Sequence, residues 1–131
     1  MTSSDFYPTL LEAAGLPLRA EQHVDGQSFL PLMRGERMDR GPIFWHYPHY
    51  GNQGGRPYAA VRLNEWKLIE FYEDRRLELY NVVDDIGESL NRASELPGLV
   101  RQLYGLLEEW RLDAGAIIPE IDPEWCPSSG D

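Results

Sequence analysis

The side chains best suited to chemistry gather in FWHYPHY, residues 44–50, which holds two histidines and four aromatic rings. His46 and His49 are three positions apart, a spacing that on a helix would bring both imidazoles to one face, as a metal site requires. Pro48 lies between them and disfavours a helix, and residues three apart on a regular strand point to opposite faces. Chelation would therefore need a bend at Pro48 and ligands from elsewhere.

Two other interpretations of FWHYPHY remain open. In the first, Trp45 and Tyr47 pack in a core while the histidines satisfy hydrogen bonds. In the second, the aromatic and imidazole groups form a pocket wall that faces a polar ligand, and GNQGG at residues 51–55 provides a mobile rim. Arg56 follows these glycines and is placed to pair bidentately with an anionic ligand group, although a solvated arginine fits the same spacing.

Other reactive residue types do not form a catalytic pattern. Cys126, the one cysteine, lies in EWCPSSGD without the base partner or positive surroundings that a nucleophilic thiolate needs. The acidic turn residues lack the ligand spacing of a calcium loop, so we interpret them as solvated charges: Glu73, Asp74, Asp84, Asp85 and Glu88. No Ser-His-Asp order or phosphate-binding glycine loop is found, and we expect no catalytic residue and no metal ligand in this chain.

Size and charge limit the class of protein. The 131 residues are enough for one folded unit, and the net charge of −10 opposes binding to nucleic acid or to an anionic membrane surface. No run of about 18 apolar residues predicts a membrane span. The first residues lack the basic-then-apolar order of a signal peptide, and the compartment is left open.

Two helices are expected before residue 42. Asp5 is placed to cap a helix that ends at Gly15, and Ser28 to cap a short helical turn that ends at Gly35. The sequence between them, LPLRAEQHVDGQ, contains a proline and the turn pair Asp-Gly, so it predicts an irregular connection.

An antiparallel sheet and a long helix are expected after residue 42. Four β-prone runs cover residues 43–47, 58–63, 66–72 and 76–82, and their short spacers favour consecutive hairpins. A helix then begins at Pro97, and its apolar residues advance by three and four, so one face should lie on the sheet. The fold class is α+β: about four antiparallel strands packed against a long C-terminal helix, preceded by one helix and a short helical turn.

The order of these motifs resembles the C-terminal part of the type I sulfatases, sulfuric ester hydrolases of the alkaline-phosphatase-like superfamily. The resemblance runs over residues 3–120 and is carried by SSDFYPTLLEAAGLPL, DGQSFLPLMRG, FWHYPHY and AAVRLNEWKLIEFYEDRRLELYNVVDDIGESLNRASELP. It implies three segments: residues 1–41 as the end of the large domain and the connection, 42–120 as the C-terminal subdomain, and 121–131 as a flexible tail.

The resemblance also implies where the catalytic groups lie. In this family a C/S-x-P-x-R motif supplies the formylglycine nucleophile beside a calcium ion, both in the N-terminal domain. Cys126 is followed directly by a proline and by no arginine, so it does not match that motif. Formylglycine and calcium are therefore expected in the N-terminal domain, no cofactor is expected in this chain, and the chain alone should be inactive.

In similar sulfatases the FWHYPHY region returns toward the catalytic cleft, which implies substrate-binding roles for His46, Tyr47, His49 and Arg56. The implied partners are the N-terminal catalytic domain, a sulfated small molecule or sugar bound by the complete enzyme, and a second copy of the chain through self-association. Family members are often periplasmic or secreted. The alternative is a stand-alone binding or interaction module that kept the fold without catalysis.

Overall fold

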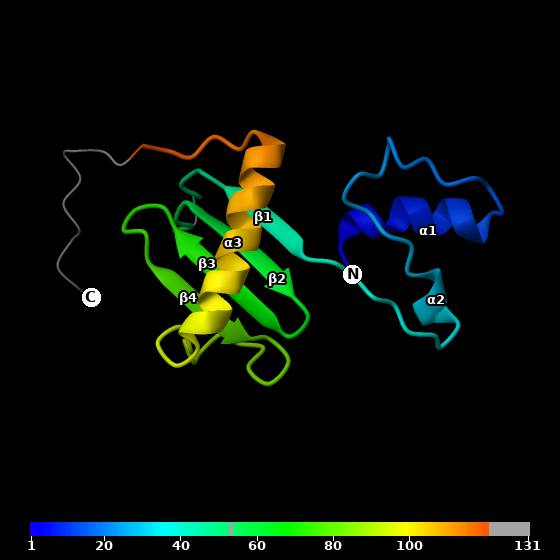
Figure 1. Cartoon of the computed structure of the whole chain (residues 1–131). Coiled ribbons are helices and arrows are strands. Elements are labelled where there is room, and N and C mark those ends of the chain that lie inside the picture. Colours follow the sequence, from blue (N-terminus) through cyan, green and yellow to red (C-terminus); the bar gives the residue numbers. More distant parts are fainter. Residues whose placement is uncertain (53, 121–131) are drawn as a thin grey trace. The chain divides into compact units, whose positions relative to one another are not determined.

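The computed structural model describes residues 1–52 and 54–120, and the chain divides into two units, Met1–Gly41 and Pro42–Asp131 (Figure 1). In the first unit, a 3₁₀ turn at Ser3–Asp5 leads into helix α1, Phe6–Ala13. The short helix α2 spans Leu30–Met33, close to where the sequence predicts it. Residues 16–29 between the two helices contain no helix or strand, as expected.

Asp5 does not cap α1 through its side chain, so that prediction is wrong. Its side chain is fully buried and its two carboxylate oxygens accept hydrogen bonds from the backbone N–H groups of Thr2, at 2.7 Å, and Gln27, at 3.0 Å. Arg40 forms an ion pair with the same carboxylate at 2.7 Å. Asp5 does not cap the helix because its carboxylate forms tertiary contacts that join the two ends of the unit. Its hydrogen bonds and ion pair are made to Thr2, Gln27 and Arg40.

Close backbone contact fixes the connection between α1 and α2. Gly26 lies against the 3₁₀ turn, where a Cβ atom would come within 2.4 Å of the Ser4 carbonyl oxygen. Thr9 donates a hydrogen bond to the Asp5 carbonyl at 2.6 Å and accepts one from the Phe29 N–H at 3.0 Å. The sequence pair Asp25-Gly26 therefore marks a tightly packed turn.

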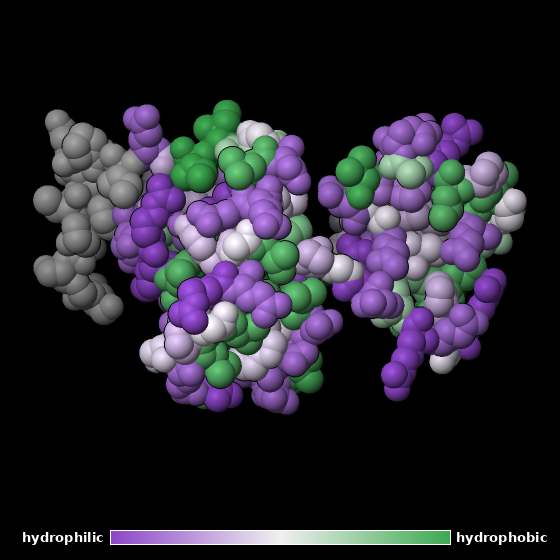
Figure 2. Space-filling model, in the orientation of Figure 1, coloured by the Kyte–Doolittle hydropathy of each residue, from purple (hydrophilic) through white to green (hydrophobic). Residues whose placement is uncertain are grey.

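Part of the first unit is apolar and exposed. Phe6 and Leu10 of α1 are 56% and 65% exposed, so the first helix is only partly covered. Figure 2 shows hydrophobic side chains at the surface of this unit between hydrophilic ones. Self-association through this surface stays a prediction.

The second unit contains a four-stranded antiparallel sheet in the order β1-β2-β3-β4, with a long helix lying across it (Figure 1). The strands are β1, Ile43–Tyr47; β2, Tyr58–Leu63; β3, Trp66–Phe71; and β4, Leu77–Asn81. Helix α3 spans Pro97–Ala114 and ends at Gly115, whose φ of 61° is left-handed. The tight turn between β2 and β3 places Asn64 at φ 55°, a conformation that asparagine tolerates better than most residues. These elements confirm the predicted meander, helix and fold class.

The core of this unit lies between the sheet and α3. Leu103 and Leu107 of α3 are fully buried against residues that point to the same face of the sheet: Ala59, Val61, Leu68 and Leu79. Trp66 and Trp110 are partly buried against the same cluster. The spacing of three and four along the helix therefore selects the face that packs, as predicted.

Within the described ranges, no helix has the length and apolar character needed to cross a membrane.

A buried ion pair also joins α3 to the sheet. Arg111 donates a hydrogen bond to the carboxylate of Glu70 on β3, and both side chains are almost inaccessible to solvent. The Arg111 guanidinium also lies over the ring of Tyr72 at 5.3 Å. Burial lowers the pKa of Arg111, but the hydrogen bond and charge of Glu70 outweigh it, so the net pKa is raised and the guanidinium stays charged.

Candidate functional site

Strand β1 divides FWHYPHY between two faces of the sheet. Phe44 and His46 point toward α3, where Phe44 stacks on Trp110 at a ring distance of 5.0 Å. Trp45 and Tyr47 point to the opposite face, here called the open face, and are 37% and 42% exposed. The interpretation that these two aromatic side chains pack in a core is therefore wrong. The alternation follows from the two-residue period of a strand.

His46 is half-buried and both of its ring nitrogens have partners. Nδ1 lies 2.7 Å from the Tyr72 hydroxyl, and Nε2 lies 3.1 Å from the backbone carbonyl of Ile117. Because a carbonyl only accepts hydrogen bonds, Nε2 must carry the proton, and Nδ1 of the neutral ring then accepts from Tyr72. Burial raises the pKa of Tyr72, so its hydroxyl remains a donor at neutral pH. In this geometry both ring nitrogens are already hydrogen bonded, so neither is free for a substrate.

His49 is exposed, as expected, and its ring contacts that of Tyr47 edge-to-face at 5.7 Å. Tyr47 in turn approaches the ring of Tyr58 on β2 at 6.2 Å. The two histidines thus have different neighbours, and His46 is held on the side of α3. In residues 1–52 and 54–120, no three His, Cys, Asp or Glu side chains are grouped closely enough to bind a metal ion. Cys126 lies outside the described residues.

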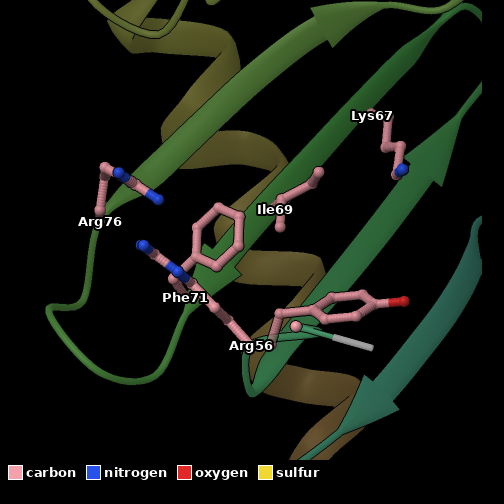
Figure 3. A pocket seen from close by; sticks show the side chains of 7 residues that line it. Arg56, Lys67, Ile69, Phe71 and Arg76 are labelled. Atoms are coloured by element: carbon pink, nitrogen blue, oxygen red, sulfur yellow. The ribbon is translucent and has the colours of Figure 1, made fainter. Parts of the chain in front are cut away.

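Arg56 lines a pocket of about 380 Å³ on the open face (Figure 3). The lining residues are Gly54, Arg56, Tyr58, Lys67, Ile69, Phe71 and Arg76. Figure 3 views this face with α3 behind the strands, and the guanidinium groups of Arg56 and Arg76 both extend toward Phe71. The pocket therefore combines an apolar and aromatic floor with three cationic side chains.

Each cation of this pocket has one acidic neighbour among the described residues. Lys67 donates a hydrogen bond to Glu88 at 2.7 Å. Through their Nε atoms, the two arginines approach glutamates at longer distances, Arg56 to Glu73 at 3.7 Å and Arg76 to Glu78 at 3.2 Å.

A second hollow, of about 520 Å³, adjoins this pocket on the open face. The two share Tyr58 and Lys67. Trp45 and Arg62 also line the second hollow, together with Glu88. The open face thus presents aromatic and cationic side chains on both sides of Tyr58.

The structure brings three of the four expected site residues into one neighbourhood. Tyr47 contacts His49 and Tyr58, and Tyr58 lines the pocket that contains Arg56. His46 lies on the opposite face of the sheet. Sequence reasoning did not single out Tyr58, Lys67, Phe71 or Arg76. A signal existed for three of them, because every second residue in Tyr58–Leu63 and in Trp66–Phe71 points to the open face.

Comparison with known proteins places this architecture among sulfatases. The family described as N-sulphoglucosamine sulphohydrolase, C-terminal, matches residues 1–111. A sulfatase of Formosa agariphila is 39% identical over 127 residues, which cover 86% of this chain and 23% of that protein. An N-acetylglucosamine-6-O-sulfatase of Bacteroides thetaiotaomicron is 29% identical over 113 residues, 80% of this chain and 20% of that protein.

Solved structures show the same similarity in three dimensions. A protein in complex with its substrate, D-glucosamine-2-N,6-O-disulfate, superposes with a TM-score of 0.66 at 28% identity, over 85% of this chain and 24% of that one. Another, in complex with k-i-k-neocarrahexaose, gives a TM-score of 0.68 at 25% identity, over 88% of this chain and 26% of that one. The chain thus spans about a quarter of the length of the relatives that it matches.

Proposed function

Because the chain belongs to the N-sulphoglucosamine sulphohydrolase C-terminal family, we propose that it works as the C-terminal part of a sulfatase and forms one side of the substrate-binding cleft. The observation that carries the proposal is the family match over residues 1–111, in a chain that spans about a quarter of its relatives. The catalytic nucleophile and the metal site belong, in this proposal, to an N-terminal catalytic domain. That domain is the main partner of this chain.

On the substrate side, we assign direct contacts to Tyr47, His49 and Arg56. The side chain of Arg56 is 57% exposed, and its guanidinium can donate two parallel hydrogen bonds to an anionic oxygen group. The exposed imidazole of His49 supplies a further donor, and the Tyr47 ring offers an apolar surface beside it. These side chains bind and orient the substrate, whereas formylglycine and calcium, supplied by the N-terminal domain, provide the bond-breaking chemistry.

His46 has a different role in this proposal. Its two hydrogen bonds join β1 to Tyr72 and to the segment after α3. We therefore assign it to positioning Tyr47 and His49, which lie one and three residues further along the chain. A hydrogen bond between a His46 ring nitrogen and substrate would require the existing hydrogen bond at that nitrogen to break.

The substrate class we propose is a sulfated sugar. Two similar structures contain sugars, one the substrate D-glucosamine-2-N,6-O-disulfate and the other k-i-k-neocarrahexaose. The aromatic and cationic side chains of the open face provide suitable chemistry, because apolar contacts hold a ring while a few polar groups fix its orientation.

Sulfate release tests this proposal. We expect no release from a sulfated monosaccharide by the purified 131-residue chain. We expect turnover from a chimera in which this chain replaces the matching region of the Formosa agariphila sulfatase. Release by the isolated chain that survives Cys126→Ala would overturn the assignment of catalysis to another domain. A folded, metal-loaded chimera without turnover would overturn the assignment of this chain to the enzyme.

A further inference from the structure

Two arginines from different segments line the pocket on the open face together with Phe71. Arg56 follows GNQGG, and Arg76 lies just before β4. The guanidinium of Arg76 lies over the Phe71 ring at 4.6 Å, and Figure 3 shows the Arg56 side chain extending toward Phe71. Cation–π contact with Phe71 holds the Arg76 guanidinium at this position in the pocket. The side chains are 57% and 44% exposed, so a ligand can reach both.

Part of the hydrogen-bonding capacity of these arginines is free within the described part of the chain. Each guanidinium has five N–H donors, and each contacts one glutamate through Nε, Arg56 to Glu73 at 3.7 Å and Arg76 to Glu78 at 3.2 Å. The terminal NH₂ groups of both arginines make no hydrogen bond to another described residue. Glu78 is in addition the acceptor of the Tyr80 hydroxyl at 2.8 Å. No carboxylate is among the residues that line the pocket. Two like charges that line one open pocket and keep terminal donors available form a site for an anion.

The rest of the pocket has the character of a ring-binding surface. Ile69 and Phe71 form its floor (Figure 3), and Tyr58 is also among its lining residues. Its volume of about 380 Å³ falls within the range of about 300–1,000 Å³ that is typical of small-molecule sites. An apolar floor under charged donors suits a ligand with an apolar ring face and an anionic substituent.

From these observations we infer that Arg56 and Arg76 form an anion subsite that binds the acidic group of a sugar ring, with Phe71 and Tyr58 in contact with the ring. The acidic group is a sulfate ester or a uronate carboxylate, since both offer paired oxygens to a guanidinium fork. The inference rests on the proposed function and deepens it, because it adds Arg76, Phe71 and Tyr58 to the substrate side.

Titration of the full 131-residue chain with simple sugars tests the subsite. The probes are N-acetylglucosamine 6-sulfate, glucuronate and neutral N-acetylglucosamine, and the readout is the change in amide chemical shifts at residues 56, 58, 71 and 76. We expect saturable binding of one or both anionic sugars at these positions and at least about tenfold weaker binding of the neutral sugar. The two anionic probes distinguish a sulfate subsite from a uronate subsite.

Substitutions of Arg76 test whether this side chain contributes to anion binding. Arg76→Ala should weaken binding at least about tenfold, and Arg76→Lys should restore only part of it, because lysine keeps the charge without the fork. Arg101→Ala is the matched control, since Arg101 is an exposed arginine of α3. Equal binding of the neutral sugar, or anion binding that is insensitive to Arg76→Ala, would overturn the inference.

Failure of the subsite and failure of the proposed function give different results. If no sugar binds at residues 56–76 while the chimera still turns over, the subsite is wrong and the proposed function stands. If Arg76→Ala instead prevents the chimera from folding, the pocket is a contact between parts of the enzyme and the subsite inference falls. Anionic sugars that bind as expected to a chain whose chimera is inactive would support the subsite and contradict the sulfatase role.

Discussion

The His46 imidazole and the Tyr72 hydroxyl lie 2.7 Å apart and join β1 to the end of β3 across an intervening strand. Tyr72 is 2% exposed and also lies beneath the guanidinium of Arg111, 5.3 Å from its ring centroid. Arg111 is in turn hydrogen bonded to Glu70. A continuous set of polar contacts thus runs from FWHYPHY to the buried ion pair under α3.

The two histidines of FWHYPHY should behave differently on substitution. His46→Ala leaves the buried Tyr72 hydroxyl and the Ile117 carbonyl without this partner, so the free energy of unfolding should fall by about 1–3 kcal/mol. His49→Ala removes an exposed side chain and should change it by less than about 0.5 kcal/mol. Urea unfolding of both variants checks this. Equal, small effects would show that the His46 hydrogen bonds do not stabilise the fold.

The ion pair between Glu70 and Arg111 should be sensitive to loss of one partner. Arg111→Ala leaves the Glu70 carboxylate buried, with Arg75 as its remaining ion-pair partner among the described residues, at 3.4 Å, and should cost about 3–5 kcal/mol of folding free energy. Arg101→Ala, on the exposed side of the same helix, should cost less than about 0.5 kcal/mol. Thermal unfolding of the two variants compares them. A similar melting temperature for both would contradict the buried pair.

The packing of α3 on the sheet should contribute to the free energy of unfolding. Leu107 is fully buried against the sheet, so Leu107→Ala should lower the free energy of unfolding by about 2–5 kcal/mol. Leu112 on the same helix is 82% exposed, and Leu112→Ala serves as the matched control with an expected effect below about 0.5 kcal/mol. Chemical denaturation followed by tryptophan fluorescence reports on this unit, because Trp66 and Trp110 pack on its core. An unchanged midpoint for Leu107→Ala would show that the helix packs differently.

Stability of the first unit should depend on pH through Asp5. Burial raises the pKa of Asp5, but hydrogen bonds from the Gln27 and Thr2 N–H groups and the charge of Arg40 outweigh it, so the net pKa lies below the usual value. A depressed pKa means that this stabilisation is present above the unfolded pKa of about 3.9 and is lost as the pH falls through the lower folded value.

Amide hydrogen exchange at Gln27 measures this effect, because its N–H binds the Asp5 carboxylate. Protection should decrease below about pH 4 in the parent chain. In Asp5→Asn it should already be lower at pH 7, and it should show less pH dependence. Glu36→Gln alters an exposed carboxylate in the same unit and should behave like the parent. Identical pH profiles for the parent chain and Asp5→Asn would contradict the role of Asp5.

Local patterns predicted the elements, because their causes are local. The two-residue alternation in YAAVRL and WKLIEFY and the apolar spacing after Pro97 identify strands and helix without reference to distant contacts. The role of Asp5 was not predictable in the same way, since its partners Gln27 and Arg40 lie 22 and 35 residues further along the chain. An aspartate that caps a helix and an aspartate whose buried carboxylate makes tertiary contacts cannot be distinguished from the local sequence.

In the candidate site, too, contacts between residues that are distant in sequence could not be predicted. Arg56 was identified because it follows a glycine-rich segment, but Arg76 has no local feature that distinguishes it from a solvated turn residue. The sheet brings it to the same pocket through the β3–β4 turn. His46 was grouped with His49 by proximity in sequence, whereas the strand turns the two toward different neighbours and Tyr72 fixes the first.

The most direct test of the central claim, that this chain forms the substrate side of a sulfatase, is kcat/KM for a sulfated monosaccharide in the chimera with the Formosa agariphila sulfatase. Arg56→Ala and His49→Ala should each lower kcat/KM by at least about tenfold with unfolding unchanged, because each removes a proposed substrate contact at an exposed position. Arg101→Ala is the control and should leave kcat/KM within about twofold of the parent. An active chimera whose kcat/KM is the same in all three variants would contradict the claim.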